Sequence, residues 1–124
     1  MPDLLESLPI YIRIVKGIKD AILNGDLKEE EQLLSTTYLS KTYNINIATV
    51  NKAINILVDE GLVYKKRGIG MFVKAGALNQ LREERKNLFK NKYVKAFLDE
   101  AKRLDISPEE LQKIVKEAIE EMNK

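Results

Sequence analysis

The sequence predicts a mainly helical fold that contains one small β-hairpin. In several segments, apolar residues recur at the three- and four-residue spacing that places them on one face of a helix. The stretch from Leu62 to Val73 instead combines short apolar runs with a turn that contains glycine. The chain has 124 residues, of which 44% are hydrophobic and 32% are charged. Such a chain can bury the core of one small domain that carries a short appendage.

The first predicted helix has Pro9 in its first turn and ends at Asn24 and Gly25. Proline suits the first turn of a helix, where its missing amide would have no partner. Gly25 ends the helix because glycine adopts positive φ without a Cβ clash. The apolar residues on one side of this helix are Ile10, Ile14, Ile18, Ala21 and Ile22. We expect the acidic segment 29–31 that follows to be a solvated loop, with the chain re-entering the core at Leu33 and Leu34.

Two short helices joined by a tight turn come next. Ser35 is the expected N-cap of a helix over residues 36–43, and Asn46 is the expected cap of a helix that ends at Gly61. The apolar stripe of the second helix comprises Val50, Ala53, Ile54, Leu57 and Val58. Away from that stripe lie Thr49, Asn51, Lys52 and Asn55. This order is typical of a helix-turn-helix, whose second helix enters the major groove of DNA.

The predicted hairpin is strongly basic. Lys65, Lys66 and Arg67 precede Gly68, and residues 62–75 contain four basic residues and no acidic ones. Lysine and arginine bind phosphates and release condensed counterions when they do so. A basic hairpin directly after a DNA-reading helix therefore indicates a wing. The alternatives are an ordinary solvated turn and an ordinary hydrated helix surface.

Beyond Ala75 the pattern is helical again. We expect a long helix, either straight or bent, whose apolar stripe weakens between Lys90 and Lys95. Ser107, Pro108 and Glu110 then combine a capping hydroxyl, a first-turn proline and a glutamate three residues after the cap, which indicates the start of a last helix. We place a boundary near Gly76, between a winged helix-turn-helix domain over residues 1–75 and a helical tail over residues 76–124.

The tail is the expected dimerisation element. Two amphipathic helices cannot cover both of their apolar faces against each other, so exposed stripes favour joining an identical chain in a two-fold homodimer. The alternative is that the tail packs on its own winged helix. The expected dimerisation residues are Leu88, Phe89, Phe97, Ala101, Leu104, Leu111, Ile114, Val115, Ala118, Ile119 and Met122.

Residues 9–73 resemble the winged-helix DNA-binding domain of GntR-type bacterial transcription regulators. The resemblance lies in PIYIRIVKGIKDAILNGDLKEEEQLLS (Pro9 to Ser35) and INIATVNKAINILVDEGLVYKKRGIGMFV (Ile45 to Val73). Residues 76–124 resemble the short two-helix tail of the YtrA-like subfamily. The resemblance implies a transcription regulator that binds double-stranded DNA, and a two-fold homodimer predicts an inverted-repeat operator. We expect a repressor, and activation stays open as the alternative.

The resemblance also implies a DNA-binding surface. In the family, the start of the recognition helix contacts bases and phosphates, and the wing tip enters or skirts the minor groove. Leu34 stands in place of the usual proline, and Thr37 and Asn51 stand where arginine is common, so we expect an operator that differs from the family's commoner sites. The expected DNA-binding residues are Ser35, Thr36, Thr37, Asn46, Ala48, Thr49, Asn51, Lys52, Asn55, Lys65, Lys66, Arg67, Gly68 and Gly70.

Composition excludes several other functions. The chain has neither cysteine nor histidine, which removes thiolate zinc sites, cysteine nucleophiles and Ser-His or Cys-His catalysis. The acidic runs fit a loop and a helix start, so we expect no enzyme, no cofactor and no metal. No apolar run approaches the roughly 20 residues that span a bilayer, so we expect a cytoplasmic protein without a membrane partner. The open alternative is a winged helix that binds protein or RNA, and a small-molecule effector also stays open.

Overall fold

A computed structural model of the chain describes residues 7–124. The chain forms two compact units, one that ends at Glu83 and one that spans Glu84–Lys124. Their boundary lies inside helix α4 (Ala77–Leu88), not at its start near Gly76. The reason is that Ala77 and Leu81, at the beginning of α4, are buried in the core of the first unit. The functional division into domains near Gly76 stays a prediction.

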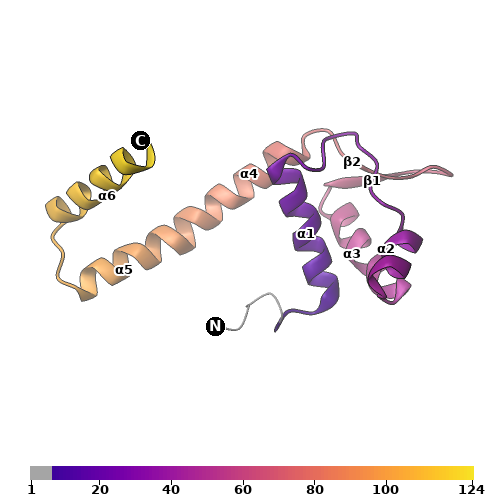
Figure 1. Cartoon of the computed structure of the whole chain (residues 1–124), viewed down its shortest axis with the longest axis horizontal. Helices are drawn as coiled ribbons and strands as arrows, with labels where there is room; N and C mark the ends of the chain where they lie inside the picture. Colours follow the sequence, from indigo (N-terminus) through magenta and orange to yellow (C-terminus); the bar gives the residue numbers. More distant parts are fainter. Residues whose placement is uncertain (1–6) are drawn as a thin grey trace. The chain divides into compact units, whose positions relative to one another are not determined.

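The first unit contains three helices followed by a hairpin (Figure 1). The helices are α1 (Ile10–Asn24), α2 (Thr36–Tyr43) and α3 (Ile47–Asp59), and the strands are β1 (Val63–Lys66) and β2 (Gly70–Val73). The strands are antiparallel, with Val63 opposite Val73. This order confirms the predicted fold class, a helix-turn-helix with a β-hairpin wing.

The core of the first unit is aliphatic and is centred on α3. This helix buries four residues on one face, and burying one such aliphatic side chain stabilises a fold by about 1.5–3 kcal/mol. Because that face is committed to the core, the opposite face of α3 is left at the surface. The buried core residues of the unit are Val15, Ile22, Leu33, Val50, Ala53, Ile54, Leu57, Leu62, Val63, Val73, Ala77 and Leu81.

The predicted caps at Ser35 and Asn46 and the predicted stop at Gly25 are confirmed, whereas α3 ends at Asp59, two residues before the predicted Gly61. The Oγ of Ser35 accepts a hydrogen bond from the Tyr38 amide at 3.0 Å, and the Oδ1 of Asn46 accepts one from the Ala48 amide at 2.8 Å. Gly25 ends α1 with φ +84°. These caps satisfy amides that have no partner within the helix.

The acidic segment differs from the expected solvated loop, because its backbone pairs with β2. The Glu30 amide donates to the Val73 carbonyl at 2.8 Å, and the Val73 amide donates to the Glu31 carbonyl at 3.0 Å. Gln32 forms an antiparallel bridge with Phe72. Residues 30–32 therefore pair with β2 as a short third segment beside the hairpin. A two-stranded hairpin alone is marginally stable in water, and this pairing gives β2 a second neighbour.

The second unit consists of helices, with a short non-helical connection over residues 104–107. The end of α4 continues into a π-helical segment, η2 (Phe89–Val94), which continues into α5 (Lys95–Arg103). The segment covers the stretch in which the apolar stripe weakens in the sequence. The last helix, α6 (Pro108–Met122), begins as predicted, with the Oγ of Ser107 accepting a hydrogen bond from the Glu110 amide at 3.1 Å. Within residues 7–124 no helix has the length and apolarity that crossing a membrane requires.

Candidate nucleic-acid interface

Helix α3 presents polar side chains on the face opposite the core. Asn51, Lys52 and Asn55 are exposed, whereas Thr49 is half-buried. The Nζ of Lys52 lies 3.9 Å from the centroid of the Tyr11 ring on α1, a cation–π contact that limits where this ammonium group can reach. Within residues 7–124, Asn51 and Asn55 are therefore the exposed readout candidates of α3 whose side chains no contact holds in place.

The amino ends of α2 and α3 contribute the next group of predicted residues. Ser35 caps α2, and Thr36 and Thr37 form its first turn. Asn46 caps α3, and Ala48 lies in the first turn of that helix. Backbone amides at a helix start carry partial positive charge and favour an anion such as a phosphate. Both helix starts thus have the groups that position a DNA backbone.

The wing carries its positive charge at the surface. Lys65 and Lys66 lie on β1, and Arg67 lies in the turn with Gly68, which has φ +78°. The turn is closed by a hydrogen bond from the Ile69 amide to the Lys66 carbonyl at 3.0 Å. The Nζ of Lys66 lies 4.3 Å from the centroid of the Phe72 ring, so this lysine also braces the hairpin.

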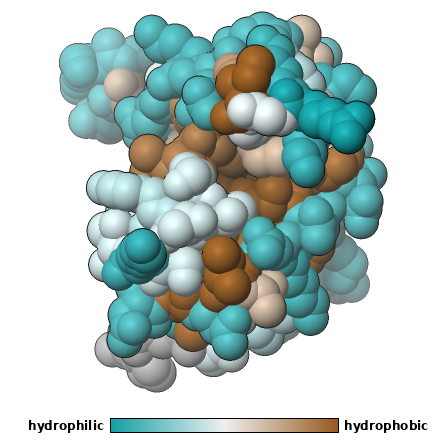
Figure 2. Space-filling view, turned by 90° about the vertical axis from the view of Figure 1, so that its right-hand side faces the viewer, coloured by the Kyte–Doolittle hydropathy of each residue, from teal (hydrophilic) through white to brown (hydrophobic). Residues whose placement is uncertain are grey.

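A groove of about 400 Å³ lies between the start of α2, the exposed face of α3 and the wing. Seen from the side of α2 and the hairpin, the surface is hollowed, with hydrophobic residues in the hollow and residues of hydrophilic or intermediate hydropathy around it (Figure 2). The lining of the groove contains one lysine and no acidic residue. The predicted residues that it brings together are Ser35, Thr36, Asn51, Asn55, Lys65 and Gly70. Those that do not line it are Thr37, Asn46, Ala48, Thr49, Lys52, Lys66, Arg67 and Gly68.

The chemistry of this lining fits a duplex. An asparagine amide can donate to and accept from the edge of adenine, and lysine can bind a phosphate oxygen. The apolar side chains of Leu34 and Ile69, both exposed and both lining the groove, can contact a thymine methyl group or a sugar.

Sequence reasoning missed Gln32. Its side chain lines the groove, and its Nε2 donates a hydrogen bond to the Ile69 carbonyl at 3.0 Å. Nothing local marks this residue, since it stands beside three glutamates that read as a solvated loop. The bond joins residues 37 positions apart in the chain, so only the folded arrangement reveals it.

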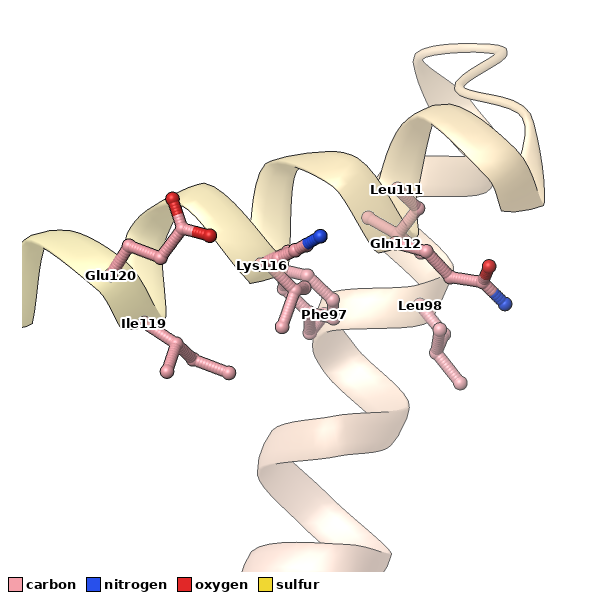
Figure 3. A pocket seen from close by; sticks show the side chains of 8 residues that line it. Phe97, Leu98, Leu111, Gln112, Lys116, Ile119 and Glu120 are labelled. Carbon is pink, nitrogen blue, oxygen red and sulfur yellow. The ribbon is translucent and has the colours of Figure 1, made fainter.

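The second unit contributes an apolar surface. A groove of about 590 Å³ lies between α5 and α6, where Phe97 and Leu98 meet Leu111, Val115 and Ile119 (Figure 3). Most of the expected dimerisation residues are exposed, among them Phe89 at 59% and Met122 at 76%. Leu111 is half-buried. Ala101 differs from them, because it is buried within its own unit at 6% exposure.

Relatives of the chain are bacterial transcription regulators. Residues 10–73 match the model of the family described as bacterial regulatory proteins, gntR family. The repressor YtrA of Bacillus subtilis is 30% identical over 115 residues, which cover 93% of this chain and 88% of YtrA. The repressor NagR of the same organism is 36% identical over 73 residues, which cover 59% of this chain and 30% of NagR. The chain thus spans less than a third of the length of NagR.

Solved structures of regulators resemble the whole chain or its first part. A GntR-family transcriptional regulator from Bacteroides thetaiotaomicron is 33% identical with a TM-score of 0.72, over 92% of this chain and 99% of that chain. The DNA-binding domain of AraR, solved in complex with an operator, is 30% identical with a TM-score of 0.51, over 53% of this chain and 80% of that chain. With a family match over residues 10–73 and a relative that matches nearly its full length, this chain belongs to the GntR family of bacterial regulatory proteins and resembles its YtrA-like members.

Proposed function

We propose that the protein is a sequence-specific DNA-binding repressor that acts as a homodimer on an inverted-repeat operator. The observation that carries the proposal is the groove of the first unit, in which Asn51 and Asn55 of α3 face the same space as Lys65 of the wing. Base-reading amides and a phosphate-binding ammonium group then engage one duplex together. The proposed partner is double-stranded DNA, and the proposed location of the protein is the cytoplasm.

The relatives support the same function. The AraR DNA-binding domain, which resembles the first unit, is solved with operator DNA, and YtrA and NagR are named repressors. In our proposal α3 enters the major groove, and the amino ends of α2 and α3 bind the flanking phosphates. The turn with Arg67 and Gly68 lies along the adjacent backbone or minor groove.

The second unit is the proposed dimerisation element. Phe97, Ile119 and Met122 of this unit are 44%, 49% and 76% exposed. A contiguous exposed apolar patch marks an interaction surface. A two-fold copy of the same surface would cover these side chains. Two recognition helices in such a dimer reach half-sites that are separated by about one helical turn of DNA, roughly 34–36 Å, or a multiple of it.

Selection of bound sequences from a random duplex pool tests the proposal. The full-length chain is expected to enrich a two-fold symmetric motif, and gel-shift titration with the enriched duplex should show binding at physiological salt that a scrambled duplex does not compete away. A single-stranded and a double-stranded RNA competitor are included in the titration. Enrichment of no motif, or preference for RNA over the enriched duplex, would contradict the proposal.

A further inference from the structure

Gln32 contacts the wing at two points. Its side-chain Nε2 donates a hydrogen bond to the carbonyl of Ile69, beside the turn, at 3.0 Å. Its backbone forms an antiparallel bridge with Phe72 further along β2. The next residue, Leu33, is buried and donates its amide to the Met71 carbonyl at 2.8 Å. One side of the wing is therefore fixed to this segment rather than left as a free hairpin.

Gly70 provides the space that the Gln32 side chain occupies. The backbone of Gly70 has φ +149°, a conformation that L side chains rarely adopt. A Cβ at this position would lie 2.5 Å from the Nε2 of Gln32, well inside van der Waals contact. A larger residue at position 70 would therefore push the glutamine side chain out of place. The glycine matters here for the fit of Gln32 and not only for the turn.

The segment of Gln32 also leads directly to the recognition elements. Three residues later Ser35 caps α2, and both residues line the groove together with Asn51 and Lys65. The segment thus contacts the wing through Gln32 and leads into the helix-turn-helix at Ser35. The segment therefore connects the wing to the elements that face it across the groove.

We propose that Gln32 is a positioning residue for DNA recognition. Its hydrogen bond to Ile69 holds the wing at one distance from α3, so that Lys65 and Asn51 meet a single duplex simultaneously. Without the bond the wing keeps its charge but moves relative to α3. The contact of Lys65 with a phosphate and the contact of Asn51 with a base are then no longer held at one spacing, and forming both at once costs more free energy. This inference rests on the proposed DNA-binding function and assigns a role within it to a residue that lies outside the helix-turn-helix and outside the strands of the hairpin.

Gln32→Met tests the proposal because methionine has nearly the same length and lacks the donor. The matched control is Gln80→Met, since the Nε2 of Gln80 also donates to a backbone carbonyl of the same unit, that of Glu60, at 2.8 Å. Binding of the full-length chains to the selected duplex and to its scrambled form is measured by fluorescence anisotropy. If the bond stabilises the competent position of the wing by about 1 kcal/mol, its loss lowers the population of that position and predicts up to about fivefold weaker binding to the selected duplex for Gln32→Met. Binding to the scrambled duplex should be unchanged, and Gln80→Met should resemble the wild type on both.

A double-mutant cycle gives a second test that does not depend on the choice of methionine. Gly70→Ala should weaken binding to the selected duplex in the wild-type background, where the new Cβ meets the glutamine side chain. The same substitution in a Gln32→Ala background should weaken binding less, because the side chain that it displaces is already gone. Thermal unfolding of each variant shows whether a loss of binding follows from loss of folded protein.

The outcomes separate this inference from the proposed function. If the wild type prefers its selected duplex but Gln32→Met and Gln80→Met bind it equally well, the positioning role is wrong and the DNA-binding function stands. Additive effects of Gly70→Ala and Gln32→Ala would equally overturn the positioning role. If the wild type prefers no duplex over its scrambled form, both the function and the positioning role fail.

Discussion

Glu29 caps the amino end of a helix that begins 48 residues later in the sequence: its Oε1 accepts a hydrogen bond from the Leu78 amide at 3.2 Å. The same oxygen accepts a second bond, from the Gly76 amide, at 3.0 Å. These amides are among those at a helix start that have no partner within the helix, and the carboxylate charge also favours the positive end of the helix dipole. Glu29 therefore joins the acidic segment to α4 in the way that Gln32 joins it to the wing.

Removing this cap should destabilise the first unit. Glu29→Ala leaves the two amides without their acceptor and is expected to lower the free energy of unfolding by about 1 kcal/mol, the usual effect of losing a helix cap. Thermal and urea unfolding followed by circular dichroism measure the change. Glu84→Ala, at an exposed glutamate further along the same helix, is the control and should leave the unfolding free energy within about 0.5 kcal/mol of the wild type. Equal stability of the two variants would argue against the cap.

The wing charges should control the salt dependence of DNA binding. Lys65→Ala with Arg67→Ala removes two exposed positive charges and leaves Lys66, which braces Phe72, in place. The plot of log K against log salt has a negative slope, and each lost phosphate contact reduces its magnitude by about 0.9. The double variant should therefore bind more weakly, with a slope whose magnitude is smaller by about two. Gel-shift titrations over a range of salt give the slope.

The control for the wing variant is Lys16→Ala with Lys28→Ala. It removes the same charge from exposed positions of the same unit that do not line the groove. Its slope should stay near that of the wild type. A wing variant that keeps the wild-type slope, or a control that loses as much as the wing variant, would refute phosphate binding by the wing.

Asn51 should contribute specificity more than affinity. Replacing it with alanine removes an amide that can bond to a base edge, and such a contact is worth about 1–3 kcal/mol of discrimination between bases. We expect Asn51→Ala to bind the selected duplex more weakly, to bind scrambled DNA as before and to relax the selected motif at one position in each half-site. Asn79→Ala, at an exposed asparagine of α4, is the control. A motif unchanged in the Asn51 variant would remove this residue from the set of base-reading side chains.

The apolar face of the second unit should control the oligomeric state. Phe97→Ser with Ile119→Ser removes two side chains that line the α5–α6 groove. If a second copy covers these side chains, each substitution removes burial worth about 1.5–3 kcal/mol and shifts the dimer toward the monomer. Analytical ultracentrifugation at several concentrations measures the change, and Glu117→Ser on α6, which does not line the groove, should leave the dimer intact. A wild-type chain that sediments as a monomer would contradict the proposed dimer.

Tyr64 links the wing to the acidic segment by an interaction that depends on pH. Its hydroxyl donates a hydrogen bond to the Glu30 carboxylate. The pKa of Tyr64 is raised above its ordinary 10.0. The main cause is this hydrogen bond, followed by burial and by the charge of Glu30. Because the pKa is raised in the folded protein, the stabilisation is complete below pH 10.0 and is lost as the pH rises through the raised value.

An absorbance titration near 295 nm measures this shift. One of the five tyrosines should ionise at higher pH than its ordinary value, and Tyr64→Phe should remove that component. Glu30→Gln should return the pKa of Tyr64 toward its ordinary value without removing a tyrosine. A high-pH component that persists in the Tyr64 variant would assign the shift to another residue.

The elements of the fold could be predicted because their signals are local. Ser35, Asn46 and Ser107 each cap a helix that begins at the next residue, and each bonds to an amide two or three residues away. The stripe on α3 has a helical period, so it identifies both the buried face and the face left at the surface. Half of the groove, including Asn51 and Lys65, could be predicted from this face and the basic turn.

The rest of the site depends on contacts between distant parts of the chain. The side chains of Gln32 and Glu29 bond to partners 37 and 49 residues away, and no periodicity in the sequence encodes such pairs. The sequence of this segment therefore indicates a solvated acidic loop, and only the structure shows that its backbone pairs with β2. Likewise, the boundary between the compact units could not be placed from the glycine at position 76, because it depends on the burial of Leu81 in a core built mostly from earlier residues.

The π-helical segment η2 (Phe89–Val94) also affects how the tail can vary in length. Its hydrogen bonds run from residue i to i+5 instead of i+4, so the segment holds one residue more than the α-helical turn it replaces. Removing one residue there, for example Asn91, would let the end of α4 and α5 run on as one α-helix with the direction of Phe97 and Leu98 kept, whereas adding a residue to an α-helix turns everything beyond it by about 100°. In this stretch a single-codon deletion would therefore disturb the tail less than a single-codon insertion.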